Sequence, residues 1–169
     1  MTIATEYQIL LNTAKAKRKE NKSFFERVKK QRPKDLDQIT NQLHREAFQR
    51  IDCLQCANCC STTSPLLKNR DIDALAGQKK MRPSVFTDQY LRIDEDGDYV
   101  FKSTPCPFLG SDKHCSVYDF RPKACREYPH TQQNDILKKI PITYNNSMIC
   151  PAVALIVENL IKHYTREKR

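Results

Sequence analysis

The sequence predicts an α+β protein with a helical N-terminal arm at residues 1–50 and a small cysteine-rich domain at residues 51–169. Three observations support this fold class. Apolar residues recur at helical spacing before residue 51, a hairpin signal lies near residue 95, and an apolar run follows Pro151. A chain of 169 residues can bury one modest core. We therefore expect helices at both ends and short β-hairpins between them.

The N-terminal fifty residues predict two or three helices. Residues 3–31 mix many charged side chains with a few apolar ones, and Pro33 ends this stretch because proline breaks a helix. Residues 34–50 form a clearer helix, since their apolar residues recur at steps of three and four. The apolar residues of that face are Leu36, Ile39, Leu43 and Ala47.

The middle of the chain predicts short elements. A loop at residues 61–65 leads into a helix at residues 70–76, which Asn69 can cap and Gly77 can end. Pro83 suits the first turn of another helix that runs to about residue 91.

Two hairpins are expected next. The first joins strands at residues 91–93 and 99–102 through the polar turn at residues 94–97. A calcium loop is excluded there, because the carboxylates that the template requires are missing at its first and last positions. The second hairpin surrounds Gly110, and residues 122–127 predict one helical turn.

The last forty residues divide into two parts. Residues 131–147 are polar and show no clear pattern, whereas a helix is expected from Pro151 to about Tyr164. No internal repeat is visible in the chain.

Composition excludes several classes of protein. The chain has three glycines, too few for the glycine-rich loops that hold phosphates and dinucleotides. Its longest apolar run, residues 152–157, is far shorter than a membrane-spanning helix, and the N-terminus lacks the charge order of a signal peptide. We therefore expect a cytoplasmic protein without membrane contact, whose thiols stay reduced.

The cysteines carry the strongest functional signal. Four of the eight lie within the string CLQCANCC, which is too dense for ordinary packing. Two-residue gaps let a tight turn present sulfurs to one metal centre, and the repeated step is the spacing by which ferredoxins hold iron–sulfur clusters. The cysteines are Cys53, Cys56, Cys59, Cys60, Cys106, Cys115, Cys125 and Cys150.

Several metal arrangements fit this count. Two zinc ions, one zinc ion with one iron–sulfur cluster, or one cluster with four remaining thiols are all compatible with eight soft ligands. Cys59 and Cys60 depart from the ferredoxin pattern, because adjacent side chains point apart and are expected to serve different sites unless one is spare. His114 or His130 could replace a cysteine, although eight cysteines leave little need for either.

The order of motifs resembles the CxxCxxCC cysteine-cluster family, also called YkgJ-like. The resemblance rests on CLQCANCC, on CPFL at residues 106–109, on CSVYDFRPKACREYP at residues 115–129 and on the late Cys150. It implies a zinc- or iron-chelating domain in which the first seven cysteines are ligands and Cys150 is a less secure eighth. A flagellin lysine methylase has a similar cysteine motif and is an iron–sulfur protein, which favours a cluster here.

Two arginines near the cysteines are expected to tune the site. A four-thiolate centre with zinc or an oxidised cubane carries a charge of about −2, which a nearby guanidinium would offset while donating hydrogen bonds to sulfur. Arg121 and Arg126 are the candidates, although each is equally compatible with a solvated surface position.

The charge is uneven along the chain. Residues 1–50 hold 12 Lys and Arg against 6 Asp and Glu. Their net charge of +6 is most of the net charge of +9 that the whole chain carries. Such a surplus could bind an acidic protein or RNA, but acidic residues interrupt it and no aromatic residues interleave with it for stacking on bases.

These observations favour a metal-binding protein with a structural, redox or metal-carrying role. Two alternatives remain open. The first is a protein-modifying enzyme like the methylase. No cofactor-binding glycine motif and no isolated catalytic group in the sequence supports this alternative, so no catalytic residue is assigned. The second is an interaction module that metal folds and whose basic arm binds RNA or an acidic partner.

Overall fold

The computed structural model describes residues 3–132 and 134–166, and it divides into two compact units. Unit 1 joins residues 1–56 to residues 129–169, and unit 2 consists of residues 57–128. The predicted boundary between two domains at residue 50 stays a prediction. The compact units group the chain differently, because they place its C-terminal part with the N-terminal helices and not with the middle segment.

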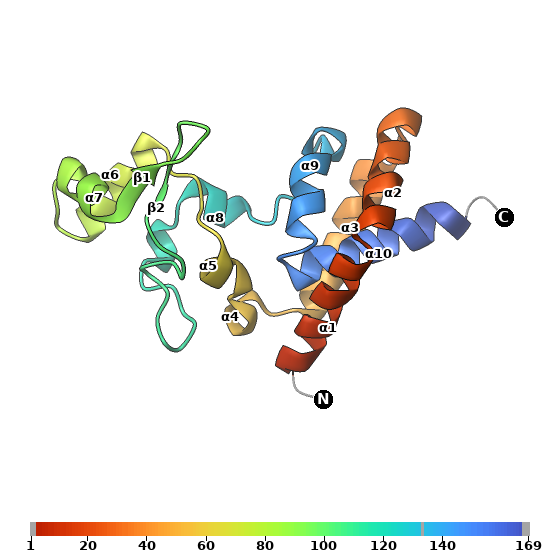
Figure 1. Ribbon diagram of the computed structural model, residues 1–169, viewed down its shortest axis with the longest axis horizontal. Helices are drawn as coiled ribbons and strands as arrows, with labels where there is room; N and C mark the ends of the chain where they lie inside the picture. Colours follow the sequence, from red (N-terminus) through yellow and green to blue (C-terminus); the bar gives the residue numbers. More distant parts are fainter. Residues whose placement is uncertain (1–2, 133, 167–169) are drawn as a thin grey trace. The chain divides into compact units, whose positions relative to one another are not determined.

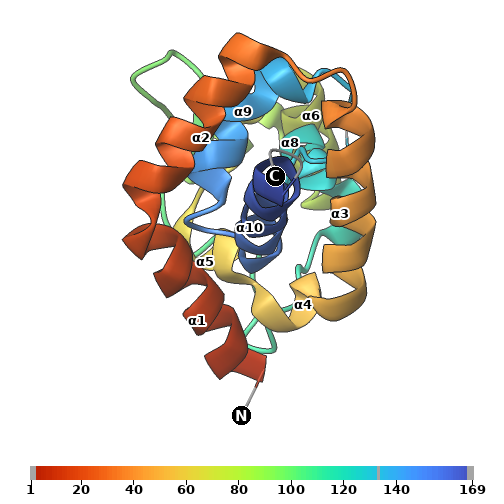
Figure 2. The ribbon, with the colours of Figure 1, turned by 90° about the vertical axis from the view of Figure 1, so that its right-hand side faces the viewer.

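Unit 1 is helical, and helix α10 lies at its centre. Figure 2 shows α10 end-on among the longer helices of this unit, and the contacts between elements agree. The helices are α1 (Ile3–Ala16), α2 (Arg18–Gln31), α3 (Leu36–Arg50), α4 (Cys53–Cys56), α9 (Ile136–Asn146) and α10 (Pro151–Arg166).

The sequence explains why α10 is central. The helix begins at Pro151, whose fixed φ suits a first turn. Its first seven residues are all buried, so this part is apolar on every side and has to be surrounded. Val153, Ile156 and Leu160 have no measurable exposure. The predicted C-terminal helix is confirmed.

Helices α1 and α2 confirm the prediction of helices before Pro33, and they pack against the rest of unit 1. Phe24, Phe25 and Val28 form the buried face of α2. The helix ends at Arg32, which adopts a left-handed conformation and donates its N–H to the Val28 carbonyl over 2.8 Å. The segment expected to be an arm therefore contributes to the hydrophobic core of unit 1.

Helix α9 was not expected from the sequence, because residues 131–147 lacked a clear apolar pattern. Its first turn is stabilised by another helix. Asp37 of α3 accepts hydrogen bonds from the backbone N–H groups of Asp135 and Ile136, each over 2.9 Å. These two donors would have no partner within their own helix. Ile136 and Ile140 are buried, so packing and a cap from α3 explain a helix that local pattern does not indicate.

Unit 2 surrounds a smaller core with short elements (Figure 1). Strands β1 and β2 pair in antiparallel register, with Leu91 opposite Phe101, which confirms the first predicted hairpin. The aromatic rings of Phe86, Phe101 and Phe108 pack together in the core. The elements are α5 (Asn58–Thr62), α6 (Asn69–Gln78), α7 (Pro83–Tyr90), β1 (Leu91–Ile93), β2 (Tyr99–Phe101), a 3-10 helix (Tyr118–Phe120) and α8 (Lys123–Glu127).

Three local predictions for unit 2 need correction. Helix α6 includes both Asn69 and Gly77, because the cap comes from Asp71, whose Oδ2 accepts the Lys68 N–H over 3.0 Å. The second predicted hairpin is reduced to a single antiparallel bridge between Leu109 and Cys115. The expected loop at residues 61–65 begins two residues later, since α5 extends to Thr62.

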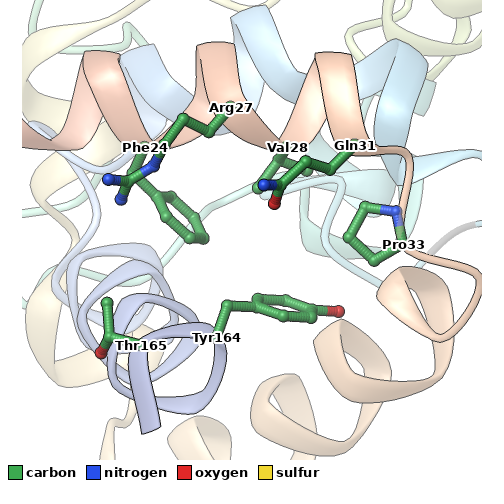
Figure 3. A pocket seen from close by; sticks show the side chains of 7 residues that line it. All are labelled: Phe24, Arg27, Val28, Gln31, Pro33, Tyr164 and Thr165. Atoms are coloured by element: carbon green, nitrogen blue, oxygen red, sulfur yellow. The ribbon is translucent and has the colours of Figure 1, made fainter. Parts of the chain in front are cut away.

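A small cavity lies in unit 1 between the end of α2 and the end of α10. Its volume is about 50 Å³, far below the roughly 300–1,000 Å³ of a typical ligand pocket. Figure 3 shows its lining, which contains no cysteine: Phe24, Arg27, Val28, Gln31, Pro33, Tyr164 and Thr165. No helix in the described part of the chain has the length and hydropathy needed to cross a membrane.

Replacing Ile156 by alanine tests the central position of α10. The change removes fully buried methyl groups and leaves a cavity, so we expect the free energy of unfolding to fall by about 2–5 kcal/mol. Ile9→Ala is the matched control, since Ile9 is 48% exposed and its truncation should cost about 0.5 kcal/mol or less. Denaturant unfolding of both variants measures the difference. Equal losses would contradict a core built around α10.

Candidate metal centre

The cysteine-dense string folds into two short helices with a kink between them. Cys53 and Cys56 begin and end α4, and Cys59 and Cys60 lie in α5. Ala57 separates the helices in a left-handed conformation with φ of 47°. All eight cysteines lie within the described residues, and their sulfurs are thiols, not disulfides. The sulfurs of Cys59 and Cys60 are 4.0 Å apart.

In unit 2, backbone hydrogen bonds bring later cysteines to α5. The Cys106 N–H donates to the Cys60 carbonyl over 2.8 Å, which fixes the two loops side by side. Cys115 is held by its bridge to Leu109 and by the neighbouring bond from the Ser116 N–H to the Phe108 carbonyl, also 2.8 Å. These contacts explain how cysteines that are 46 and 55 residues from Cys60 in the sequence gather beside it.

Cys125 is positioned by a buried carboxylate that sequence reasoning missed. Asp71 is 7% exposed and contacts two segments. One oxygen caps α6 at Lys68, and the other accepts the Lys123 N–H over 2.9 Å at the start of α8. The start of α8, two residues before Cys125, is thereby fixed against α6. The sequence signal was only that of a capping residue, since nothing in it links Asp71 to α8.

Burial and mutual repulsion disfavour ionisation of these thiols. Burial, together with the charge of the Cys60 thiolate, raises the pKa of Cys106 to about 11 and that of Cys125 to about 12. Burial and then the Cys60 charge also raise the pKa of Cys115. The sulfurs of Cys60, Cys106, Cys115 and Cys125 therefore lie within electrostatic reach of one another. We refer to these four residues as the unit 2 thiol group.

Backbone N–H groups near the thiols favour their charged forms. The amides of Phe108 and Leu109 hydrogen-bond to the Cys106 side chain, and that of Val117 to the Cys115 side chain. Hydrogen bonds from amides to sulfur stabilise thiolates and hold them in position. These donors are backbone groups, so residue identities alone could not reveal them.

Cys60 differs from the other thiols of its group. A hydrogen bond from Cys59 lowers the pKa of Cys60 to about 7; burial opposes this shift, and the positive charge of Arg121 supports it. Cys60 therefore ionises more readily than Cys106, Cys115 or Cys125.

The two predicted arginines occupy different positions. The Arg121 guanidinium lies 3.4 Å from the centre of the Tyr118 ring, and its Nε donates to the Tyr118 carbonyl over 2.7 Å. Its charge lowers the pKa of Cys60, Cys115 and Cys125. Tyr118 is 45% exposed, and its ring contacts this arginine.

Arg126 contacts the backbone next to Arg121. Its Nη1 donates to the Arg121 carbonyl, so it orients that segment. The arginine whose charge lowers the pKa of the thiols is Arg121 and not Arg126. His114, which the sequence offered as a replacement for a cysteine ligand, lies against Asp112.

A second set of thiols lies in unit 1. Cys150 is 6% exposed at the start of α10, and burial raises its pKa. The charges of Cys53 and Cys56 raise this pKa further, so both sulfurs lie within electrostatic reach of Cys150. We refer to these three residues as the unit 1 thiol group.

The thiols suit a soft metal by their chemistry. Zinc and iron–sulfur clusters both prefer several thiolates, and a cation would remove the repulsion that disfavours ionisation here. In their present side-chain positions, no three His, Cys, Asp or Glu residues among those described could hold a metal ion. Binding would therefore have to draw the sulfurs together.

A largely helical protein whose thiols are mostly half-buried and lie in two groups belongs to the broad class of cysteine-rich metal-binding proteins. The match to a family model is more specific. The chain belongs to the CxxCxxCC family, described as a "putative zinc- or iron-chelating domain", and the match covers residues 52–150, which include all eight cysteines. No curated protein and no solved structure matches the chain.

The low pKa of Cys60 predicts its reactivity in metal-free protein. Because a thiolate is the reactive form, alkylation of Cys60 should reach half its maximal rate near pH 7, while Cys106 stays slow until far higher pH. Cys59→Ala removes the hydrogen bond and should shift the Cys60 profile to higher pH. Iodoacetamide labelling followed by peptide mass spectrometry measures both profiles. Superimposable profiles for Cys60 and Cys106 would contradict this assignment.

Proposed function

We propose that the protein binds zinc or an iron–sulfur cluster through its clustered cysteine thiolates, with a structural, redox or metal-carrying role. One observation carries the proposal. Four thiols from four separate segments, Cys60, Cys106, Cys115 and Cys125, lie within electrostatic reach of one another in unit 2. Half-buried thiols gathered in this way repel one another as thiolates unless a cation neutralises them.

The family description supports metal chelation and leaves zinc and iron open. Within the proposal, Cys53, Cys56, Cys59 and Cys150 are further ligands, and Arg121 offsets the charge of the thiolates. A bound metal would supply Lewis acidity or electron transfer, according to its identity. A cytoplasmic location, which would keep eight thiols reduced, is part of the same proposal.

Analysis of anoxically purified protein tests the proposal directly. Zinc, iron and acid-labile sulfide are measured per chain. Stoichiometric zinc in colourless protein, or matched iron and sulfide in brown protein, is the expected result. Folded protein that holds none of these under anoxic handling would contradict the proposal.

Cys106→Ser tests the ligand set in unit 2. We expect loss of the metal from this group and a large fall in the stability of unit 2, because a structural zinc supplies an apparent binding energy of about 10–16 kcal/mol, against a total stability of about 5–15 kcal/mol for a typical domain. Metal content and circular dichroism are measured together. Ser116→Ala is the control, since it alters a neighbouring side chain and removes only a 3.1 Å hydrogen bond to the Phe108 carbonyl.

The proposal requires Cys106→Ser and Ser116→Ala to differ in metal content. Full metal content in soluble, folded Cys106→Ser protein would exclude Cys106 as a ligand. Equal metal loss in Ser116→Ala would show that disturbance of the loop, not removal of the sulfur, is responsible.

A second candidate function rests on the basic helices of unit 1. Residues 15–34 hold ten Lys and Arg against two acidic residues, and all ten basic residues are exposed. Such a surface favours binding to a polyanion such as RNA. In this second function, the metal would serve only to fold the protein that binds the RNA. The aromatic residues Phe24 and Phe25 are buried, so contacts would be to phosphates and not to bases. A modification enzyme, the other alternative, has no observation of the structure in its favour.

Substitution is the appropriate test of this surface, because deletion of α1 and α2 would remove part of the core. Replacing Lys19, Lys22, Lys29 and Lys30 by glutamine should weaken RNA binding. The slope of log affinity against log salt should become shallower by about 0.7–0.9 for each phosphate that the variant leaves without a cation. The control replaces the exposed Lys80 and Lys102 of unit 2 by glutamine. Binding is measured by fluorescence anisotropy over a range of salt. Equal effects of the two sets would exclude a specific surface.

A further inference from the structure

The small cavity between the ends of α2 and α10, here called the α2–α10 cavity, borders a basic segment of unit 1. Residues 27–34 hold five Lys and Arg and no acidic residue, and all five are exposed. Within the described part of the chain, none of these five side chains forms an ion pair with a carboxylate. Arg27 is one of the five, and it also lines the cavity. This surface therefore favours an anionic partner.

The cavity has apolar walls and hydrogen-bond donors at its rim. Phe24 and Val28 of α2 are each 3% exposed, and the ring centre of Tyr164 on α10 lies 6.3 Å from that of Phe24. Arg27 and Gln31 of α2 are exposed, and no described group hydrogen-bonds to either side chain. Figure 3 shows their guanidinium and amide groups on the α2 side of the cavity. A ligand can therefore contact aromatic rings and accept hydrogen bonds at the same time.

A carboxylate of the protein lies at one end of the cavity. The hydroxyl of Tyr164 donates a hydrogen bond to Oδ1 of Asp35 over 3.0 Å. Figure 3 shows this hydroxyl at the end of the cavity where Pro33 lies. The guanidinium of Arg27 lies at the other end, near Thr165. A negative group of a ligand is therefore favoured at the Arg27 end, away from Asp35.

The size of the cavity limits what can enter it. Its volume is about 50 Å³, and a water-sized group takes up about 10–15 Å³ on the same measure. The cavity therefore admits about three or four non-hydrogen atoms, which is the end of one side chain. A carboxylate with its adjoining methylene group fits this volume. A phosphate diester is larger, and the apolar walls would not replace its hydration.

We propose that this surface of unit 1 binds an acidic protein segment, one glutamate of which inserts its side chain into the α2–α10 cavity beside Arg27. The methylene groups of that glutamate would contact the aromatic walls, and its carboxylate would accept hydrogen bonds from Arg27 and Gln31. The exposed cations of residues 27–34 would attract the rest of the segment. The inference goes beyond the proposed function, because it depends neither on the identity of the metal nor on its presence.

Binding of an acidic peptide to the full chain tests the proposal. The probe is a short fluorescein-labelled peptide of glutamate and leucine, and its affinity is measured by fluorescence anisotropy. Thr165→Phe leaves every charge in place and adds a ring at the cavity lining, so we expect the affinity to fall about tenfold. Ser23→Phe is the control, because it adds the same ring at an exposed position of α2 outside the lining.

A second pair of variants tests the charge at the cavity. Arg27→Gln removes the guanidinium that would bind the carboxylate, and we expect it to weaken peptide binding about tenfold. Arg45→Gln makes the same change at an exposed position of α3 outside the lining, and it should weaken binding about threefold or less. Circular dichroism checks that each variant is folded. All four replaced side chains are exposed, so their substitution leaves the core of unit 1 unchanged.

The pairs of variants have to separate. Equal losses of affinity in Thr165→Phe and Ser23→Phe, or in Arg27→Gln and Arg45→Gln, would overturn insertion into the cavity. Absence of saturable peptide binding to the wild type would overturn the acidic partner. A single-stranded RNA is measured in parallel, and its affinity should not change in Thr165→Phe. RNA binding that Thr165→Phe weakens as strongly as peptide binding would overturn the preference for an acidic protein segment.

Discussion

The fold of unit 2 is governed by the gathering of half-buried thiols. A thiol is a small and weakly polar group that packs well when it is neutral, but a thiolate is costly to bury and repels its neighbours. Cys106, Cys115 and Cys125 show both effects, since burial and the charge of Cys60 each disfavour their ionisation. A soft cation reverses the balance, because it turns repulsion between thiolates into shared attraction.

Much of unit 2 can be understood as the scaffold for these thiols. Its core of Phe86, Phe101 and Phe108 is small, and its elements are short. Specific polar contacts do the positioning. Asp71 joins the starts of α6 and α8, and the Cys106 amide joins its loop to Cys60. A domain of this size gains little from hydrophobic burial alone, which is why small domains so often depend on bound metal.

Unit 1 follows a different physical logic. Its centre is α10, a helix apolar enough at its start to be enclosed by α1, α2, α3 and α9 (Figure 2). Hydrophobic burial supplies its stability, and the basic residues of α1 and α2 occupy the outer face that remains. The same helix that forms this core begins with a capped, buried cysteine.

Local sequence signals were sufficient to predict several of the helices and one hairpin. Helical spacing predicted α3, proline marked the starts of α7 and α10, and a turn with Gly97 predicted the β1–β2 hairpin. Cysteine spacing predicted a metal-binding protein, and the family match supports that class. The assignment of the cysteines to two compact units, the helical state of α9 and the identity of the arginine whose charge acts on the thiols could not be predicted from the sequence. Each of these depends on contacts between distant residues, such as Asp37 with Ile136 or Cys60 with Cys106, and local pattern carries no information about such pairs.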